Sequence, residues 1–132
     1  MTYLLDTHII VWALTDTKRL SANVRVVLEN PRNRLLVSTV SFWEVSTKFA
    51  LNKLELVALL PEDLPAACEA MGLEITTMSA EAASTYHQLP AQYHKDPFDR
   101  MLIWQAMIGG YTLLSSDSAV HKYASGSFKV VW

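Results

Sequence analysis

This chain of 132 residues has only one cysteine, no long apolar run and no excess of positive charge. The single cysteine, Cys68, excludes an internal disulfide framework and a zinc cluster built on cysteine. No apolar run approaches the roughly 18 residues of a membrane-spanning helix, and the first residues do not resemble a signal peptide. The net charge of −2 excludes a polycation that holds nucleic acid by bulk charge. We therefore expect a cytoplasmic protein with no membrane partner.

The composition favours a globular domain with a large core over disorder, because 51% of the residues are hydrophobic and 18% are charged. The length fits one domain, residues 1–132, at roughly 150 residues per domain. Basic residues are unevenly spread: seven lie up to Lys53, and none lies from Leu54 to His94, where six acidic residues lie. This pattern fits either ordinary surface charge or a basic face for an anionic partner.

Short apolar runs alternate with helical stripes along the chain. The runs predict strands at residues 3–5, 34–38, 73–77, 111–114 and 129–131. The stripes and their capping residues predict helices at residues 8–14, 21–30, 41–51, 61–71, 79–88 and 96–110. Because repeated strand–helix units form parallel sheets, we expect one α/β domain with a central parallel sheet of about five strands and helices on both faces.

Four acidic residues stand where parallel strands end or where the next helices begin. Asp6 directly follows the first expected strand, and Asp117 follows the strand at 111–114. Glu44 and Asp99 fall on the first turns of expected helices. Ligands of open parallel sheets bind outside the carboxyl ends of the strands, so the four carboxylates can meet there. Such a cluster persists only where a cation offsets its repulsion, and all-oxygen ligands suit Mg²⁺ or Mn²⁺.

Each of these acids also has an ordinary structural interpretation. Glu44 falls at the last position of a capping box. Asp96 and Asp99 match an N-cap followed by an acid that the helix dipole favours. Asp117 could close a turn, whereas Asp6 has no evident capping role. The spacing alone leaves both the metal cluster and the helix-end interpretation open.

Four sequence blocks resemble those of PIN-domain nucleases, and specifically those of VapC-type toxins from bacterial toxin–antitoxin pairs. The blocks are LLDTH at residues 4–8, VSTVSFWE at 37–44 with Lys48 and 52–54 after it, DPFDRMLI at 96–103 with 105–106, and TLLSSD at 112–117. They occur in order across essentially the whole chain. Two positions depart from the common pattern: His8 stands where many members carry Asn, and Ser115 stands where Thr is usual. Neither departure removes a carboxylate.

The resemblance implies that Asp6, Glu44, Asp99 and Asp117 form an acidic metal site that is also the catalytic site. It implies a Mg²⁺-dependent endoribonuclease, in which Mn²⁺ can substitute, and a cognate antitoxin protein that silences it. Members of this family commonly form homodimers. In such a site one or two ions screen the phosphate, help a bound water to lose its proton and stabilise the leaving 3′ oxygen.

Further residues in the blocks are candidates for supporting roles. Thr7, His8 and Ser115 are expected either to orient the metal ligands or to serve only in turns and caps. Asp96 is expected to cap its helix, with direct metal ligation as the alternative. His94 is expected at the surface, although its place just before the block leaves contact with substrate open.

Basic residues near the blocks are the candidates for contacts with RNA phosphates. They are Lys48, Lys53, Lys95 and Arg100; otherwise the basic face is expected at Arg19, Arg25, Arg32 or Arg34. Arg100 can also be read as a plain surface charge or as a contact with the antitoxin. Trp12, Trp43 and Trp104 lie at core-like helical spacing, which favours core or dimer packing over base stacking.

Two other functions fit some of these features. A receiver-like signalling domain is also a small parallel α/β protein with Mg²⁺-binding acids. It needs a Lys after its last strand, which has no place after an expected strand that runs almost to Trp132. A catalytically inactive PIN scaffold that acts only by binding is the second alternative, and the presence of all four carboxylates argues against it.

Overall fold

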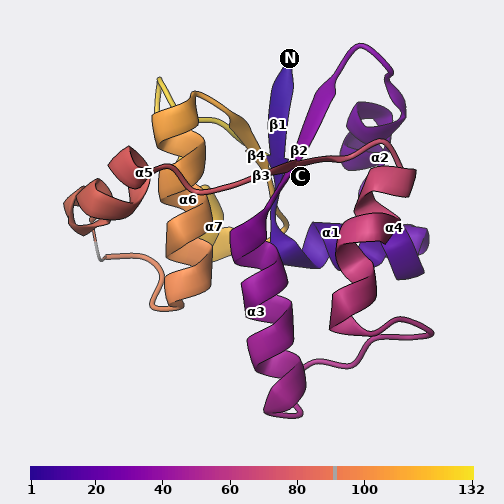
Figure 1. Ribbon diagram of the computed structural model, residues 1–132. Coiled ribbons are helices and arrows are strands. Elements are labelled where there is room, and N and C mark those ends of the chain that lie inside the picture. Colours follow the sequence, from indigo (N-terminus) through magenta and orange to yellow (C-terminus); the bar gives the residue numbers. More distant parts are fainter. Residues whose placement is uncertain (91) are drawn as a thin grey trace.

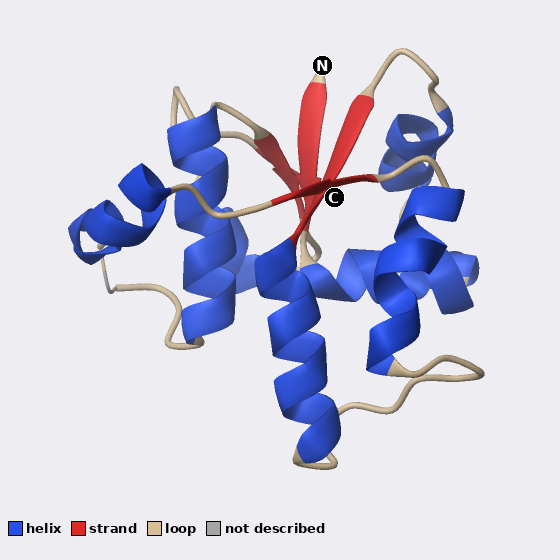
Figure 2. Ribbon diagram, viewed as in Figure 1, coloured by secondary structure: helices blue, strands red, loops and turns tan. Residues whose placement is uncertain are grey.

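The computed structural model describes residues 1–90 and 92–132, and its central feature is a five-stranded, all-parallel sheet (Figures 1 and 2). The strands lie in the order β3-β2-β1-β4-β5. Their bounds are β1 Thr2–Leu5, β2 Arg34–Ser38, β3 Glu74–Thr76, β4 Thr112–Leu114 and β5 Val130–Val131. The chain moves outward from β1 to β3 and then returns to the other side of β1. This reversal places a topological switch point between the carboxyl ends of β1 and β4, where such sheets bind ligands.

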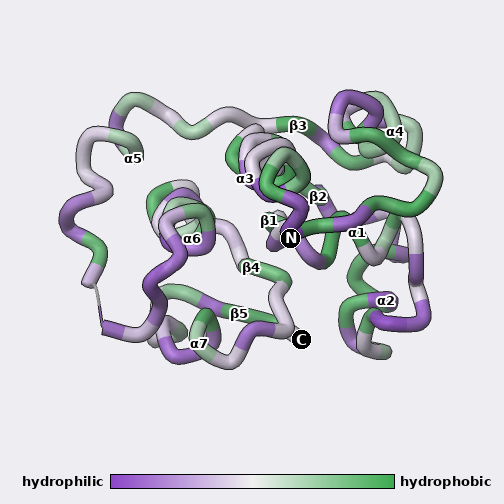
Figure 3. The backbone as a smooth tube through the Cα atoms, turned by 90° about the horizontal axis from the view of Figure 1, so that it is seen from below, coloured by the Kyte–Doolittle hydropathy of each residue, from purple (hydrophilic) through white to green (hydrophobic). Residues whose placement is uncertain are grey.

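Helices cover both faces of the sheet, as the sequence predicts. The α-helices are α1 Thr7–Thr15, α2 Ala22–Glu29, α3 Thr39–Ala50, α4 Leu64–Ala70, α5 Ala80–Thr85, α6 Pro97–Gly109 and α7 Ser118–His121, and the short 3₁₀ turns are η1 Thr17–Arg19, η2 Pro61–Asp63 and η3 Tyr86–Gln88. Figure 1 shows α5, α6 and α7 on one side and α1, α2 and α4 on the other, with α3 running on from β2 past the carboxyl ends. Figure 3 shows the same two-sided cover from below.

The apolar strands feed two separate cores, because successive side chains of a strand point to opposite faces. Leu4 and Leu113 pack on the α6 side with Ile103, whereas Leu5 and Leu114 pack on the α1 side. All five of these side chains are fully buried. Continuous apolar runs therefore identify strands that are covered on both faces. This arrangement anchors the carboxyl ends of β1 and β4 rigidly beneath the site.

Most expected elements appear within a few residues of their predicted bounds, and one difference matters for function. α3 begins at Thr39 rather than at residue 41, because the side chain of Ser38 caps it by accepting from Val40 N at 3.1 Å. Glu44 consequently lies in the second turn of α3, so the predicted capping box and its first-turn position are wrong. In the described part of the chain, no helix has the length and apolarity that a membrane crossing requires.

Candidate functional site

Asp6 occupies the turn between β1 and α1 and is 1% exposed. Its Oδ1 accepts from the backbone N–H of Thr7 at 2.8 Å, so Asp6 caps α1, a role that the sequence did not reveal. Its Oδ2 accepts from the hydroxyl of Ser115 at 2.6 Å, although Ser115 lies 109 residues away, just after β4. The carboxylate is thereby fixed from both sides of the switch point, and both its oxygens still have lone pairs for another partner.

Asp117 follows β4 and begins α7, whose first free N–H groups it faces. Its Oδ1 accepts from Ala119 N at 2.8 Å, and its own N–H donates to Ser115 Oγ at 3.1 Å. Burial acts to raise the pKa of Asp117, but the hydrogen bonds from His94 and from the Ala119 N–H hold that pKa below its ordinary value. Ser115 therefore connects Asp6 and Asp117, which agrees with its predicted orienting role.

Glu44 points from α3 toward the carboxyl end of β1 and is 5% exposed. Its Oε1 accepts from the hydroxyl of Thr7 at 2.6 Å, and its Oε2 accepts from Lys48 Nζ at 2.5 Å. Lys48 also donates to Asp96 Oδ2 at 3.1 Å. Although burial acts to lower the pKa of Lys48, its hydrogen bonds to Glu44 and Asp96 raise that pKa, so the ammonium stays charged.

Asp96 and Asp99 lie at the start of α6, and their pKa values are shifted in opposite directions. Asp96 is the N-cap, as predicted, because its Oδ1 accepts from Phe98 N at 2.9 Å. Burial acts to raise the pKa of Asp96, but the hydrogen bond from Lys48 and that from Phe98 N lower it. Burial, together with the negative charges of Asp6, Glu44 and Asp96, raises the pKa of Asp99 to about 8. Asp99 is therefore the carboxylate that lacks compensation.

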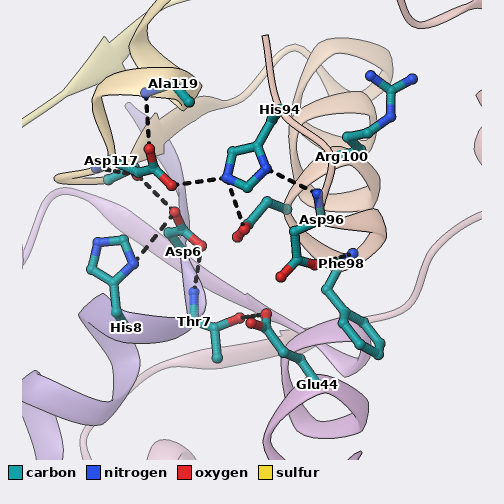
Figure 4. Close-up of polar contacts among 12 residues, drawn as sticks. Asp6, Thr7, His8, Glu44, His94, Asp96, Phe98, Arg100, Asp117 and Ala119 are labelled. Carbon is teal, nitrogen blue, oxygen red and sulfur yellow. Dashed lines mark hydrogen bonds and ion pairs between the residues drawn. The ribbon is translucent and has the colours of Figure 1, made fainter. Parts of the chain in front are cut away.

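His94 is part of this cluster, so its expected place at the surface is wrong. Its side chain is 15% exposed, and its Nδ1 accepts from the N–H of Asp96 at 3.1 Å. Because Nδ1 accepts, the ring proton lies on Nε2, which sits 2.9 Å from Asp117 Oδ2 and 3.1 Å from Asp99 Oδ2 (Figure 4). The only sequence signal was its position two residues before Asp96.

His8 supports the cluster from α1. Its Nε2 accepts from the N–H of Ser116 at 3.1 Å, which leaves the proton on Nδ1. Nδ1 lies 3.5 Å from Asp6 Oδ2. Thr7, His8 and Ser115 thus all contact a carboxylate or the turn that carries one, and their role in orienting metal ligands stays a prediction.

Two of the basic residues expected to contact RNA are occupied within the protein. Lys48 pairs with Glu44 and Asp96, as above. Arg100 is buried rather than a surface charge: its guanidinium donates to the carbonyls of Leu89 and Pro90 at 2.9 and 2.6 Å. Figure 4 shows Arg100 pointing away from the carboxylates. Arg100 therefore organises the segment that precedes His94 instead of reaching a phosphate.

A cleft of ≈ 380 Å³ opens over the carboxylates. Its lining residues are Asp6, Thr7, His8, Val11, Trp12, Arg19, Glu44, Lys48, Lys53, Leu54, Glu55, Asp99 and Asp117. The sequence-predicted acids Asp6, Glu44, Asp99 and Asp117 therefore converge on one cleft. Lys95 is exposed and is not among the described residues that line it.

The donor set suits a hard divalent cation. Most of the donor atoms are carboxylate oxygens. Burial and the neighbouring negative charges raise the pKa of Asp99, and a cation would offset those charges. Oxygens of Asp99 and Asp117 and the Nε2 of His94 lie within 4.8 Å of one another. Because Nε2 carries the ring proton, His94 acts as a hydrogen-bond donor here rather than as a ligand. Such a site can hold a cation against an anionic substrate such as a phosphodiester.

Comparisons with known proteins agree with this geometry. Among curated proteins, Ribonuclease VapC22 of Mycobacterium tuberculosis is 24% identical over 131 residues, which are 99% of this chain and 98% of that protein. VapBC2 from Rickettsia felis, solved with a DNA fragment from its promoter, and DNA-bound VapBC from Salmonella typhimurium each match with a TM-score of 0.67 and 18% identity. Both matches cover 99% of this chain, and they cover 98% and 97% of the respective relatives.

A toxin–antitoxin complex from Klebsiella pneumoniae matches with a TM-score of 0.60 and 18% identity, over 98% of this chain and 96% of that one. These structural likenesses concern the fold. The sequence itself matches the PIN domain family over residues 3–126, nearly its full length. With a parallel sheet that gathers four carboxylates at its switch point, the chain belongs to the PIN domain family.

Proposed function

We propose that this protein is a metal-dependent endoribonuclease of the VapC type, the toxin of a toxin–antitoxin pair. The observation that carries the proposal is the convergence of four carboxylates, those of Asp6, Glu44, Asp99 and Asp117, on one open cleft. Burial and the neighbouring carboxylates raise the pKa of Asp99, which supports the proposal. Buried carboxylates that crowd one another are costly unless a cation or a shared proton relieves them. The similarity to Ribonuclease VapC22 supports RNA as the substrate.

Asp6 and Asp99, with Glu44 and Asp117 directly or through water, would hold Mg²⁺, or Mn²⁺ in its place. The bound ion would supply a Lewis acid that offsets phosphate charge and makes a water nucleophilic. The chain's own groups prepare this site. The Thr7 N–H and the Ser115 hydroxyl fix the orientation of Asp6, and the Thr7 hydroxyl fixes Glu44.

Lys48 and His94 are two further hydrogen-bond donors of the site, and they affect the charge that a substrate would meet. Lys48 pairs with both Glu44 and Asp96 and so offsets one of their two negative charges on that side of the cleft. His94 presents its Nε2–H between Asp99 and Asp117, where the proton is also within reach of an incoming phosphate oxygen. In the proposed reaction, water would attack phosphorus in line with the P–O3′ bond, so that a new P–O bond forms as the P–O3′ bond breaks. The water would lose a proton and the leaving 3′ oxygen would gain one, which leaves a 5′ phosphate and a 3′ hydroxyl.

A cognate antitoxin and a second copy of the chain are the protein partners in this proposal. The structural neighbours named as toxin–antitoxin complexes support the antitoxin. Apolar side chains on and beyond α3 are exposed, and they could be covered by either partner: Trp43, Phe49, Leu51, Val57 and Leu60. Trp43 is 58% exposed, so its expected packing in the core is wrong, while packing in a dimer stays part of the proposal.

The second candidate function is an inactive PIN scaffold, and one assay separates the two. The purified protein is incubated with mixed single-stranded RNA in Mg²⁺, in Mn²⁺ and in EDTA. The proposal predicts cleavage with either ion, none in EDTA, 5′-phosphorylated products, and loss of cleavage in Asp99→Asn. The matched control is Glu81→Gln, which removes an exposed carboxylate outside the cleft and should cleave like wild type. Cleavage that persists in EDTA or in Asp99→Asn would contradict the metal mechanism.

A further inference from the structure

One wall of the acidic cleft carries a preorganised cation. The guanidinium of Arg19, in η1, lies 4.5 Å from the ring centroid of Trp12, in α1. The indole is in turn held edge-to-face by the His8 ring at 4.8 Å between centroids, and the Trp132 ring lies 6.1 Å away. Arg19, Trp12 and His8 all line the cleft that contains Asp6 and Asp99. This wall is therefore continuous with the carboxylates.

Arg19 differs from the other arginines near the site in what its N–H groups contact. Arg25 donates to the carbonyls of Leu20 and Lys18, and Arg100 is held by the segment at Leu89. Within the described residues, the Arg19 side chain donates no hydrogen bond and forms no ion pair. Its face rests on Trp12 and its donors are free, which is how a guanidinium is prepared to bind a planar or bidentate anion.

The carboxylates of the cleft repel an anionic strand, and a free cation on its wall offsets that repulsion. Lys48, although it lines the cleft, already pairs with Glu44 and Asp96. Arg19 and Lys53 are the cleft cations without a side-chain partner among the described residues. A strand whose scissile phosphate lies over Asp99 would bring a neighbouring nucleotide onto the Arg19 wall.

We propose that Arg19, held in place by Trp12, binds the nucleotide next to the scissile phosphate of a single-stranded RNA. The guanidinium contacts the flanking phosphate, and its outer face is available for a base to stack on, as Arg planes serve in single-stranded recognition. The proposal rests on the proposed ribonuclease function and deepens it. It also replaces the sequence-based expectation that Lys48 and Arg100 contact the phosphates.

The test compares Arg19→Ala with Lys18→Ala. Lys18 is the neighbouring exposed cation, its removal changes the charge equally, and it does not line the cleft. Binding of a fluorescent, mixed-sequence single-stranded RNA oligonucleotide is followed by anisotropy in EDTA across a salt series. We expect Arg19→Ala to weaken binding about three- to tenfold more than Lys18→Ala, and to flatten the log–log salt slope by about 0.7, the value of one phosphate contact on a single strand. Equal losses in the two variants would overturn the proposal.

Three further variants distinguish a direct contact of Arg19 with RNA from an effect of packing. Arg19→Lys keeps the positive charge but lacks the planar, bidentate guanidinium, so we expect weaker binding of RNA with the salt slope of wild type. Trp12→Phe keeps an aromatic platform and should bind within about twofold of wild type, whereas Trp12→Ala should weaken binding. Wild-type binding by Arg19→Lys and Trp12→Ala together would overturn the preorganised site.

Cleavage by the wild type in Mg²⁺ is measured in parallel on the same oligonucleotide. If the wild type cleaves and Arg19→Ala binds like Lys18→Ala, the Arg19 subsite is wrong and the ribonuclease function stands. If the wild type neither binds nor cleaves, the proposed function fails with it. Melting curves of every variant establish that the folded protein is being compared.

Discussion

The two sides of the acidic cleft differ in how the repulsion between their carboxylates is offset. On one side Glu44, Lys48 and Asp96 form a chain of two ion pairs, in which an ammonium lies between two carboxylates. On the other side Asp6, Asp99 and Asp117 meet with no lysine or arginine among their described ion-pair partners, and His94 supplies the N–H between the last two. The first side therefore has a fixed cation that offsets one of its two negative charges, whereas the second has three carboxylates and no such cation among its described partners, which leaves more negative charge for an external cation.

The difference is sharpest within α6. Asp96 and Asp99 lie three residues apart, yet the pKa of Asp96 is lowered and that of Asp99 is raised to about 8. Both feel burial, which raises a carboxyl pKa. At Asp96 the contacts with Lys48 and the backbone hydrogen bonds, chiefly that from Phe98 N, together outweigh burial, whereas at Asp99 the nearby carboxylates add to it. Asp96 therefore stabilises the start of α6 as its cap, and the uncompensated charge around Asp99 supports the proposal that Asp99 binds a cation.

The largest expected effect follows from neutralising the uncompensated side. Asp99→Asn keeps the shape of the side chain but removes its charge, so we expect RNA cleavage in Mg²⁺ to fall below detection. The rise in melting temperature between EDTA and millimolar Mn²⁺ should also shrink, because an ion stabilises the folded protein only to the extent that it binds to it. A variant that cleaves near the wild-type rate would show that Asp99 does no more than favour the helix dipole.

The same variant should reveal the repulsion between Asp99 and the neighbouring carboxylates through the pH dependence of stability. Because the folded-state pKa of Asp99 is raised, the folded protein binds more protons than the unfolded chain between about pH 4 and 8. Metal-free stability contributed by this group is therefore greatest at low pH and is lost as the pH rises through that window. In EDTA, the melting temperature of Asp99→Asn should increasingly exceed that of wild type from pH 5 to 8. A difference that stays constant with pH would contradict the raised pKa.

Removing the cap tests the compensated side. Asp96→Ala deletes the acceptor for Phe98 N and one partner of Lys48, so we expect it to cost about 0.5–2 kcal/mol of unfolding free energy. Much of the cleavage should survive, since Lys48 still pairs with Glu44. Asp96→Asn keeps a good capping group and should recover most of the lost stability in urea denaturation. If Asp96→Ala is as stable as wild type but inactive, Asp96 is a ligand rather than a cap.

The smallest expected effect concerns His94. His94→Ala removes the donor shared by Asp99 and Asp117, which we expect to cost about 0.5–1.5 kcal/mol of stability in EDTA, the usual worth of a buried hydrogen bond. With Mn²⁺ bound the cost should be smaller, because the cation takes over the contact between the two carboxylates. Equal costs with and without Mn²⁺ would show that His94 serves only to hold its own segment.

The sequence predicted those parts of the site that depend on local order along the chain. Asp6 and Asp117 follow strands directly, and Asp96 precedes a proline at the first position of a helix, so their places at the carboxyl rim could be inferred. The parallel order of the strands followed from their alternation with helices. The predicted start of α3 was wrong because Ser41 also fits the pattern of a cap, whereas in the structure Ser38 accepts from Val40 N and α3 begins at Thr39.

Contacts between distant segments could not be predicted in the same way. Lys48 meets Asp96 across 48 residues, and Arg100 turns inward because the carbonyls of Leu89 and Pro90 lie within its reach. His94 enters the cluster because the N–H of Asp96 fixes its ring. None of these contacts leaves a periodic or capping signal in a single sequence. They decide which charges of the site are free, which is why the sequence could not reveal that Lys48 and Arg100 are engaged within the protein.

Direct Mn²⁺ binding to the matched pair Asp96→Asn and Asp99→Asn tests the central claim most simply, namely that the uncompensated side of the cleft holds the cation. The free-ion signal in electron paramagnetic resonance is followed while each protein is titrated with Mn²⁺. Both variants lose one negative charge from the same helix, so general attraction falls equally. The account predicts that Asp96→Asn binds Mn²⁺ nearly as wild type does and that Asp99→Asn does not. Equal binding by the two variants would contradict it.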